Sequence, residues 1–158
     1  MANEEYPFNT FNFYVQLNIP NASALGMTSP VCDMEFAELD GLEMSMEPKT
    51  VKEGGNNTEQ INLVGRVTYS NVTLKRGMTS NLDLWKWFMA STGNTNRSTR
   101  ASGTILVKDA NGADRVRFLL YGCLPVKIKA PALNAKEGAV AIEEMEIALT
   151  SFRVEAPA

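Results

Sequence analysis

The chain has 158 residues, 44% of them hydrophobic and 21% charged, and its formal net charge is −3. This length predicts a single domain, and the composition excludes a disordered tail and a membrane protein. The small negative charge argues against binding to nucleic acid or to an anionic membrane. The first residues lack the basic and apolar regions of a secretory signal, and no apolar run approaches the roughly 18 residues of a membrane span. We therefore expect the protein to be made and folded in a cytosol.

The first half of the chain alternates between apolar and polar residues, the period of half-buried strands. After an N-terminal arm (residues 1–10), a strand is predicted over residues 11–18. Alternating runs at 32–36 and 42–47 flank the turn signal Asp40-Gly41 and predict a hairpin or corner with an acidic outer face. The polar, glycine-containing stretch 48–60 predicts a long loop, and loops of this length usually have a use.

One helix is predicted over residues 79–91, after strand signals at 61–64 and 67–74. Ser80 is its expected N-cap, with Asp83 in the first turn. Its apolar face consists of Leu82, Leu84, Trp85, Phe88 and Met89. Trp87 lies at the border of that face, which leaves two interpretations: a partly buried core edge, or a contact with a neighbouring subunit, where tryptophan is enriched.

The second half predicts more strands. The hairpin signal Asn111-Gly112 separates two alternating runs, and Pro125 and Pro131 bracket a third that suits a sheet edge or a strand end. Residues 140–154 fit a helix or a strand, and we predict strand because so many upstream strands need partners. The whole chain (1–158) is thus predicted to be one mainly β domain, an antiparallel two-sheet β-barrel or sandwich of about eight strands with one flanking α-helix.

The sequence offers little catalytic chemistry. It contains no histidine, which removes the commonest general base and transition-metal ligand. Its two cysteines, Cys32 and Cys123, are predicted to be buried hydrophobic residues. Asp109, Asn111 and Asp114 resemble a fragment of a calcium loop, but no glutamate follows at the required distance. We expect no catalytic, cofactor or metal site, and no enzyme activity.

An ordered series of short motifs resembles the phage T4-type tail tube proteins and their relatives in extracellular contractile injection systems. Phe36 with Leu39-Asp40-Gly41-Leu42 is similar to the family's "F-x-E-x-x-G-L" segment. The series continues with Glu53-Gly54-Gly55-Asn56-Asn57, the "L-x-R-G"-like strand end 72–78, a hairpin with Asp109 and Gly112, the Pro125 segment, and Val140-Ala141-Ile142-Glu143. Residues 121–124 depart from the pattern, because many relatives carry an aromatic residue before the proline.

The resemblance implies a structural subunit of the inner tube of a contractile phage-tail-like injection system. Six copies would form a ring, and rings would stack into a hollow tube that is driven through a target envelope and conducts a payload. The implied partners are other copies of the chain, a contractile sheath protein, and baseplate and terminator proteins. The particle would be assembled in a bacterial cytoplasm and released. Type VI secretion tube proteins share this architecture.

Two hypotheses place subunit contacts on particular residues. The polar loop 48–60 would order against the next ring, through Lys52, Glu53, Gly54, Gly55, Asn56 and Asn57. Lys75 and Arg76, two charges that end an apolar strand, would make polar contacts between subunits. Two alternatives lie within the family, a tube-initiating paralogue at the baseplate and a type VI secretion tube protein. An alternative of another class is a small β-barrel that binds an apolar ligand.

Overall fold

The computed structural model describes residues 12–20, 31–35 (backbone only), 38–52, 54–55, 58–78, 80, 82–93, 100–133, 135–136, 138 and 141–156. The elements in chain order are β1 (Asn12–Asn18), β2 (Val31–Glu35), β3 (Glu38–Asp40), β4 (Met44–Val51), β5 (Ile61–Tyr69), β6 (Val72–Gly77), α1 (Asp83–Thr92), β7 (Ala101–Lys108), β8 (Asp114–Lys129), β9 (Ile142–Ala148) and β10 (Ser151–Glu155). The predicted N-terminal arm lies outside these residues. No helix among them is long and apolar enough to cross a membrane.

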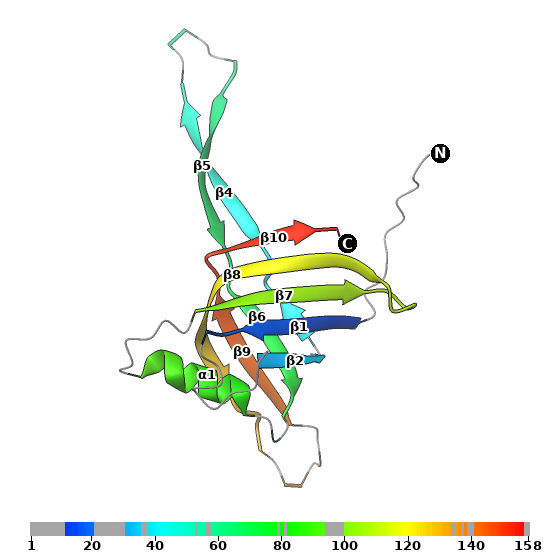
Figure 1. Cartoon of the computed structure of the whole chain (residues 1–158). Helices are drawn as coiled ribbons and strands as arrows, with labels where there is room; N and C mark the ends of the chain where they lie inside the picture. Colours follow the sequence, from blue (N-terminus) through cyan, green and yellow to red (C-terminus); the bar gives the residue numbers. More distant parts are fainter. Residues whose placement is uncertain are drawn as a thin grey trace.

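Strand β8 runs through both sheets of the body (Figure 1). Its first half pairs with β7 and β10, and β7 leads on to β1 and β2. Its second half pairs with β9, followed by β6 and β3. All of these pairings are antiparallel, so the predicted mainly antiparallel β fold with one helix is confirmed. The described residues hold ten strands in place of about eight.

The backbone of β8 changes direction between Gly122 and Lys127. Gly122 has φ +62°, and a Cβ there would lie 2.0 Å from the Thr150 Oγ1 atom, so only glycine fits. The register with β9 shifts between Pro125 and Lys127. Pro125 therefore lies inside a strand and not at its end, but on the part of β8 that, among the described strands, pairs only with β9. Of the two predicted positions, the sheet edge is the correct one, and the bulge there tolerates a residue that cannot donate to the ladder.

The core lies between the two sheets and under α1. Its most deeply buried large side chains include Trp87, Leu17, Leu84, Ile105 and Met145, each at most 1% exposed. Phe152 of β10 packs edge-on against Tyr69 and Phe118 at ring-centroid distances of 5.5 and 6.4 Å. The prediction of strand over residues 140–154 is confirmed for β9 and β10, which are separated by a short corner at Leu149 and Thr150.

Cys123 is a free, fully buried cysteine in this core, as predicted for it, while the side chain of Cys32 lies outside the described part of the structure. We expect Cys123 to resist alkylation in the folded protein, because burial raises the pKa of its thiol to about 12 and so suppresses the reactive thiolate. Iodoacetamide labelling read by mass spectrometry should modify Cys123 only after denaturation. Equal labelling rates in native and denatured chains would contradict this.

The helix begins later than predicted. It starts at Asp83 after Leu82, with no side-chain cap, so the N-cap assigned to Ser80 is wrong. Its end is as predicted, since the Gly93 amide donates to the Met89 carbonyl over 3.0 Å. The helix is also rotated relative to the predicted apolar face: Leu84 and Trp87 point into the core, whereas Met89 is 67% exposed.

The chain turns a corner between β3 and β4. The strands that we predicted as a hairpin or corner do not pair with each other, because β2 pairs with β1 and β4 pairs with β5. The corner interpretation is the correct one. Gly41 at this corner has φ +99°, and a Cβ there would lie 2.1 Å from the Asn71 carbonyl oxygen. Only glycine fits such a position, which gives a physical reason for the glycine in this motif.

Candidate assembly surfaces

Strands β4 and β5 form a two-stranded ribbon that projects from the body (Figure 1). The ladder runs from the pair Met44–Tyr69 to the pair Val51–Ile61, so residues 48–51 belong to a strand and not to the loop that was predicted over 48–60. The exposed large apolar side chains of the ribbon are Met44, Met46, Val51, Ile61, Leu63, Val64 and Val67. A free two-stranded ribbon is marginally stable in water, and clustered exposed apolar side chains mark interaction sites. The ribbon is the first candidate assembly surface.

The candidate inter-ring residues lie in the sequence between the two ribbon strands. Lys52, Gly54 and Gly55 are exposed there, whereas Glu53, Asn56 and Asn57 lie outside the described residues. At the base of the loop, the Gln60 Nε2 atom donates to the Thr50 Oγ1 atom over 3.1 Å. The loop is therefore presented at the end of an ordered ladder, and its contact with another ring stays a prediction.

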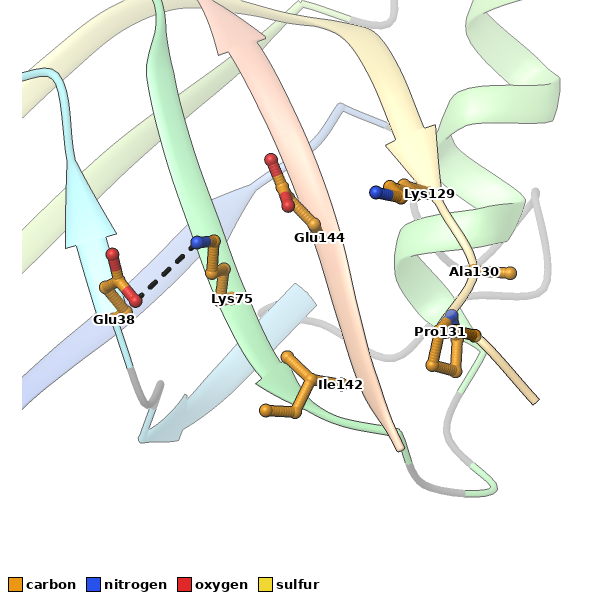
Figure 2. A pocket seen from close by; sticks show the side chains of 8 residues that line it. Glu38, Lys75, Lys129, Ala130, Pro131, Ile142 and Glu144 are labelled. Carbon is orange, nitrogen blue, oxygen red and sulfur yellow. Dashed lines mark ion pairs between the residues drawn. The ribbon is translucent and has the colours of Figure 1, made fainter. Parts of the chain in front are cut away.

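The second candidate surface is the charged face of the four-stranded sheet β3-β6-β9-β8. One row across these strands consists of Glu38, Lys75, Glu144 and Lys129, each paired in register with the next (Figure 2). A second row consists of Asp40, Thr73, Glu146 and Lys127. The Lys75 Nζ atom lies 3.7 Å from a Glu38 carboxylate oxygen. Charge sign therefore alternates across the sheet in the first row.

The opposite face of this sheet is mainly apolar. Between the two charged rows runs the row Leu39, Leu74, Met145 and Ile128, whose members are buried or packed against the core. Strand alternation explains this division, because successive side chains point to opposite faces. One face of the sheet thus packs against the core, and the charged face can contact other molecules.

A buried ion pair joins β6, β9 and α1. The Arg76 Nε atom donates to the Glu143 carboxylate, and the side chains of the two residues are 3% and 2% exposed. The Trp85 Nε1 atom of α1 donates to the other Glu143 oxygen over 2.9 Å. Arg76 therefore holds the body of the subunit together. Our assignment of Arg76 to a contact between subunits is wrong for this reason, whereas Lys75 lies on the charged face.

Trp87 is also excluded as a surface contact. Its side chain is 0% exposed and lies in the core, because the helix packs it against the sheets. The other tryptophan of the helix, Trp85, is only half-buried. Trp85 lines a shallow apolar hollow together with Met78, Leu82, Met89 and Ala130. The sequence pattern located the helix but misjudged its rotation about its own axis.

In the turn between β7 and β8, Asp109 accepts hydrogen bonds from within the hairpin. Asp109 Oδ1 accepts from the amides of Asn111 and Ala113 at 2.9 and 3.1 Å, and Oδ2 accepts from Arg115 Nε at 2.7 Å. These contacts explain the hairpin better than a calcium loop does. Within the described residues, no group of three or more histidine, cysteine, aspartate or glutamate side chains could hold a metal ion.

Asp109 gives the fold a dependence on pH. The hydrogen bond from Arg115 lowers the pKa of its carboxyl below 3.8, against the opposing effect of burial and with help from the two amides. A lowered folded-state pKa contributes stability above the unfolded-state value, and this stability is lost as the pH falls through the folded-state value. We expect Asp109→Asn to flatten the dependence of urea unfolding on pH below about 4.5. Equal slopes for wild type and Asp109→Asn would contradict the assignment.

The two-sheet fold and the surfaces described define a structural subunit. The family model for the T4-like virus tail tube protein gp19 matches residues 9–153, so the chain belongs to that family and is a structural tube protein. The comparison with curated protein sequences gave no match.

Solved structures share the fold across nearly the whole chain. A chain of the six-fold symmetrised anti-feeding prophage baseplate has a TM-score of 0.78 at 21% identity, covering 96% of this chain and 97% of its own. A chain of the sheath-tube complex of the extracellular contractile injection system PVC has a TM-score of 0.74 at 17% identity, with 98% and 95% covered. Hcp1 from Salmonella typhimurium is more distant, with a TM-score of 0.53 at 11% identity and 92% and 87% covered.

Proposed function

We propose that six copies of this chain form a ring and that rings stack into the hollow inner tube of a contractile injection system. The observation that carries this proposal is the tail tube family match over residues 9–153. The exposed apolar ribbon supports it, because a monomer would leave these side chains in water. A repeated contact between unlike surfaces closes into a ring or continues as a filament, which suits a stacked tube.

The proposed partners are a contractile sheath, a baseplate and a terminator, with a payload in the channel. Chains of similar fold come from a sheath-tube complex, a baseplate and a tube-terminating cap, and these settings support the assignment. The work of such a subunit is mechanical and lies in its surfaces, so the proposal includes no catalytic residue and no cofactor. We propose that the chain is made in a bacterial cytoplasm and leaves it within the assembled particle.

The competing ligand-binding barrel needs an apolar lumen inside one subunit. The space between the sheets is instead filled by side chains such as Trp87, Leu84 and Met145. Negative-stain electron microscopy and light scattering of the purified chain separate the two functions. Rings or tubes whose mass is a multiple of six subunits are expected. A chain that stays monomeric at every concentration and salt condition would overturn the tube proposal.

A further inference from the structure

The ribbon formed by β4 and β5 is interrupted by a β-bulge halfway along its length. Pro48 of β4 lies opposite two residues of β5, Val64 and Gly65. The backbones approach so closely there that a Cβ at Gly65 would lie 1.7 Å from the Glu47 carbonyl oxygen, so only glycine fits. The Gly65 amide also donates to the Met46 Sδ atom over 3.2 Å. The bulge divides the ribbon into a base half, residues 44–47 with 66–69, and a tip half, residues 49–51 with 61–63.

The apolar side chains of the ribbon change face at this bulge. Successive side chains of a strand point to opposite faces, and directly paired residues share a face. The first face is apolar in the base half and polar in the tip half, in the order Met44, Tyr69, Met46, Val67, Thr50 and Asn62. The second face is polar in the base half and apolar in the tip half except for one lysine, in the order Ser45, Thr68, Glu47, Arg66, Lys49, Leu63, Val51 and Ile61. The Ser45 and Thr68 hydroxyl oxygens lie 2.9 Å apart, as residues that share a face should.

Each half of the ribbon thus has one exposed apolar patch with a polar face behind it. The base patch consists of Met44, Met46 and Val67, and the tip patch consists of Val51, Ile61 and Leu63. If both patches lay on one face, two copies would cover each other about a twofold axis and assembly would end at a dimer. Because the patches lie on opposite faces, one stays free when the other is covered, and the same contact can be repeated from copy to copy.

We infer that the tip patch of one copy packs on the base patch of the next copy, so that successive ribbons overlap face to face. The occupant is a second copy because the chain itself supplies both members of the contact, with three apolar side chains on each. The methionines of the base patch are flexible enough to fit against the branched side chains of the tip patch. At about 3.3 Å per residue, the five steps from Met46 to Val51 offset neighbouring ribbons by roughly 16 Å along their length. This inference rests on the proposed function, and it adds which residues meet and why the contact has a direction.

Two one-residue changes test the inference, because both remove the bulge and only one of them moves the tip patch. Inserting a threonine between Pro48 and Lys49 gives β4 the residue that β5 has in excess, and the tip pairs turn to the face of the base patch. Deleting Val64 also makes the strands equal, but it leaves Leu63 and Ile61 on their present face. By light scattering, the insertion variant should form dimers at most, whereas the deletion variant should assemble as the wild-type chain does. Assembly of the insertion variant, or loss of assembly by a folded deletion variant, would overturn the inference.

A cross-linking experiment tests the same contact without changing the bulge. Met46→Cys/Leu63→Cys places one thiol on the base patch and one on the tip patch, and their opposite faces prevent a disulfide within one ribbon. Mild oxidation of the assembled chains should give a series of covalent multimers for this double variant. Neither single variant should exceed the background of the wild-type chain, which controls for the native cysteines.

The possible failures of the two proposals are distinguishable. Covalent dimers from either single variant would show that like patches meet, and a double variant that assembles without cross-linking would show that these patches do not meet. Either result would overturn the inference and leave the tube proposal intact. If the wild-type chain itself never assembles, both proposals fail. Melting curves identify a bulge variant that has lost its fold, and in that case the cross-linking result decides.

Discussion

Replacing Glu143 with alanine should destabilise the subunit by about 3–5 kcal/mol, the cost of removing one partner from a buried ion pair. The change takes the carboxylate away from the Arg76 guanidinium, which is buried with its side chain 3% exposed. It also removes the oxygen to which the Trp85 indole of α1 donates. The free energy of unfolding of a domain of this size is only about 5–15 kcal/mol, so this loss is a large fraction of the total. The expected fall in melting temperature is roughly 6–20 °C.

The next residue supplies a matched control. Glu144→Ala removes a carboxylate from the charged face of the same strand, where a salt bridge is worth at most about 1 kcal/mol. A third variant, Arg76→Met/Glu143→Leu, replaces both charges by apolar side chains and should recover most of the loss, because no unpaired charge remains buried. Urea unfolding of the three proteins decides the matter. Equal midpoints for Glu143→Ala and Glu144→Ala would show that the buried pair contributes no more than a surface charge.

Local pattern was enough to predict most of the strands and the class of the fold. The alternation in residues 11–18 and around Asn111-Gly112 correctly predicted β1, β7 and the first half of β8, because a period of two indicates directly which face of a strand is buried. The prediction of strand over helix for residues 140–154 was also correct, because the many strands upstream needed further strands to pair with. The pairing of the strands was harder to predict. The run at 42–47 pairs with the strand at 61–69 and not with 32–36, because tertiary contacts decide which strands become neighbours.

The site predictions were wrong where a charged residue was assumed to be a surface residue. Arg76 looked like a surface residue because it is charged and ends a strand, yet its partner Glu143 lies 67 residues away. A single sequence does not show that the two strands are neighbours, so the buried pair was invisible. The alternating charges of the sheet were hidden for the same reason. Lys127, Lys129, Glu144 and Glu146 were each visible as strand positions, but their rows exist only once the register is known.

The ribbon β4–β5 is where we expect the largest effect on assembly. Leu63→Ser/Val64→Ser removes two apolar side chains that are 50% and 83% exposed in the subunit. Both side chains are exposed in the monomer, so its melting temperature should stay within about 2 °C of wild type, as for other exposed substitutions. In an assembly the same side chains would be covered by a neighbour, and each loses about 1.5–3 kcal/mol of burial when it becomes polar. Repeated around a ring, this loss should abolish rings and tubes.

Leu133→Ser is the matched control, because Leu133 is 86% exposed but lies outside the ribbon.

Deleting residues 53–57 at the ribbon's end separates two roles of the hairpin: if the loop sets only axial stacking, single rings persist while tubes disappear. Light scattering measures ring mass, and negative-stain microscopy measures tube length, so the two losses are told apart. Wild-type tubes from Leu63→Ser/Val64→Ser would show that the apolar ribbon contributes no contact to the tube.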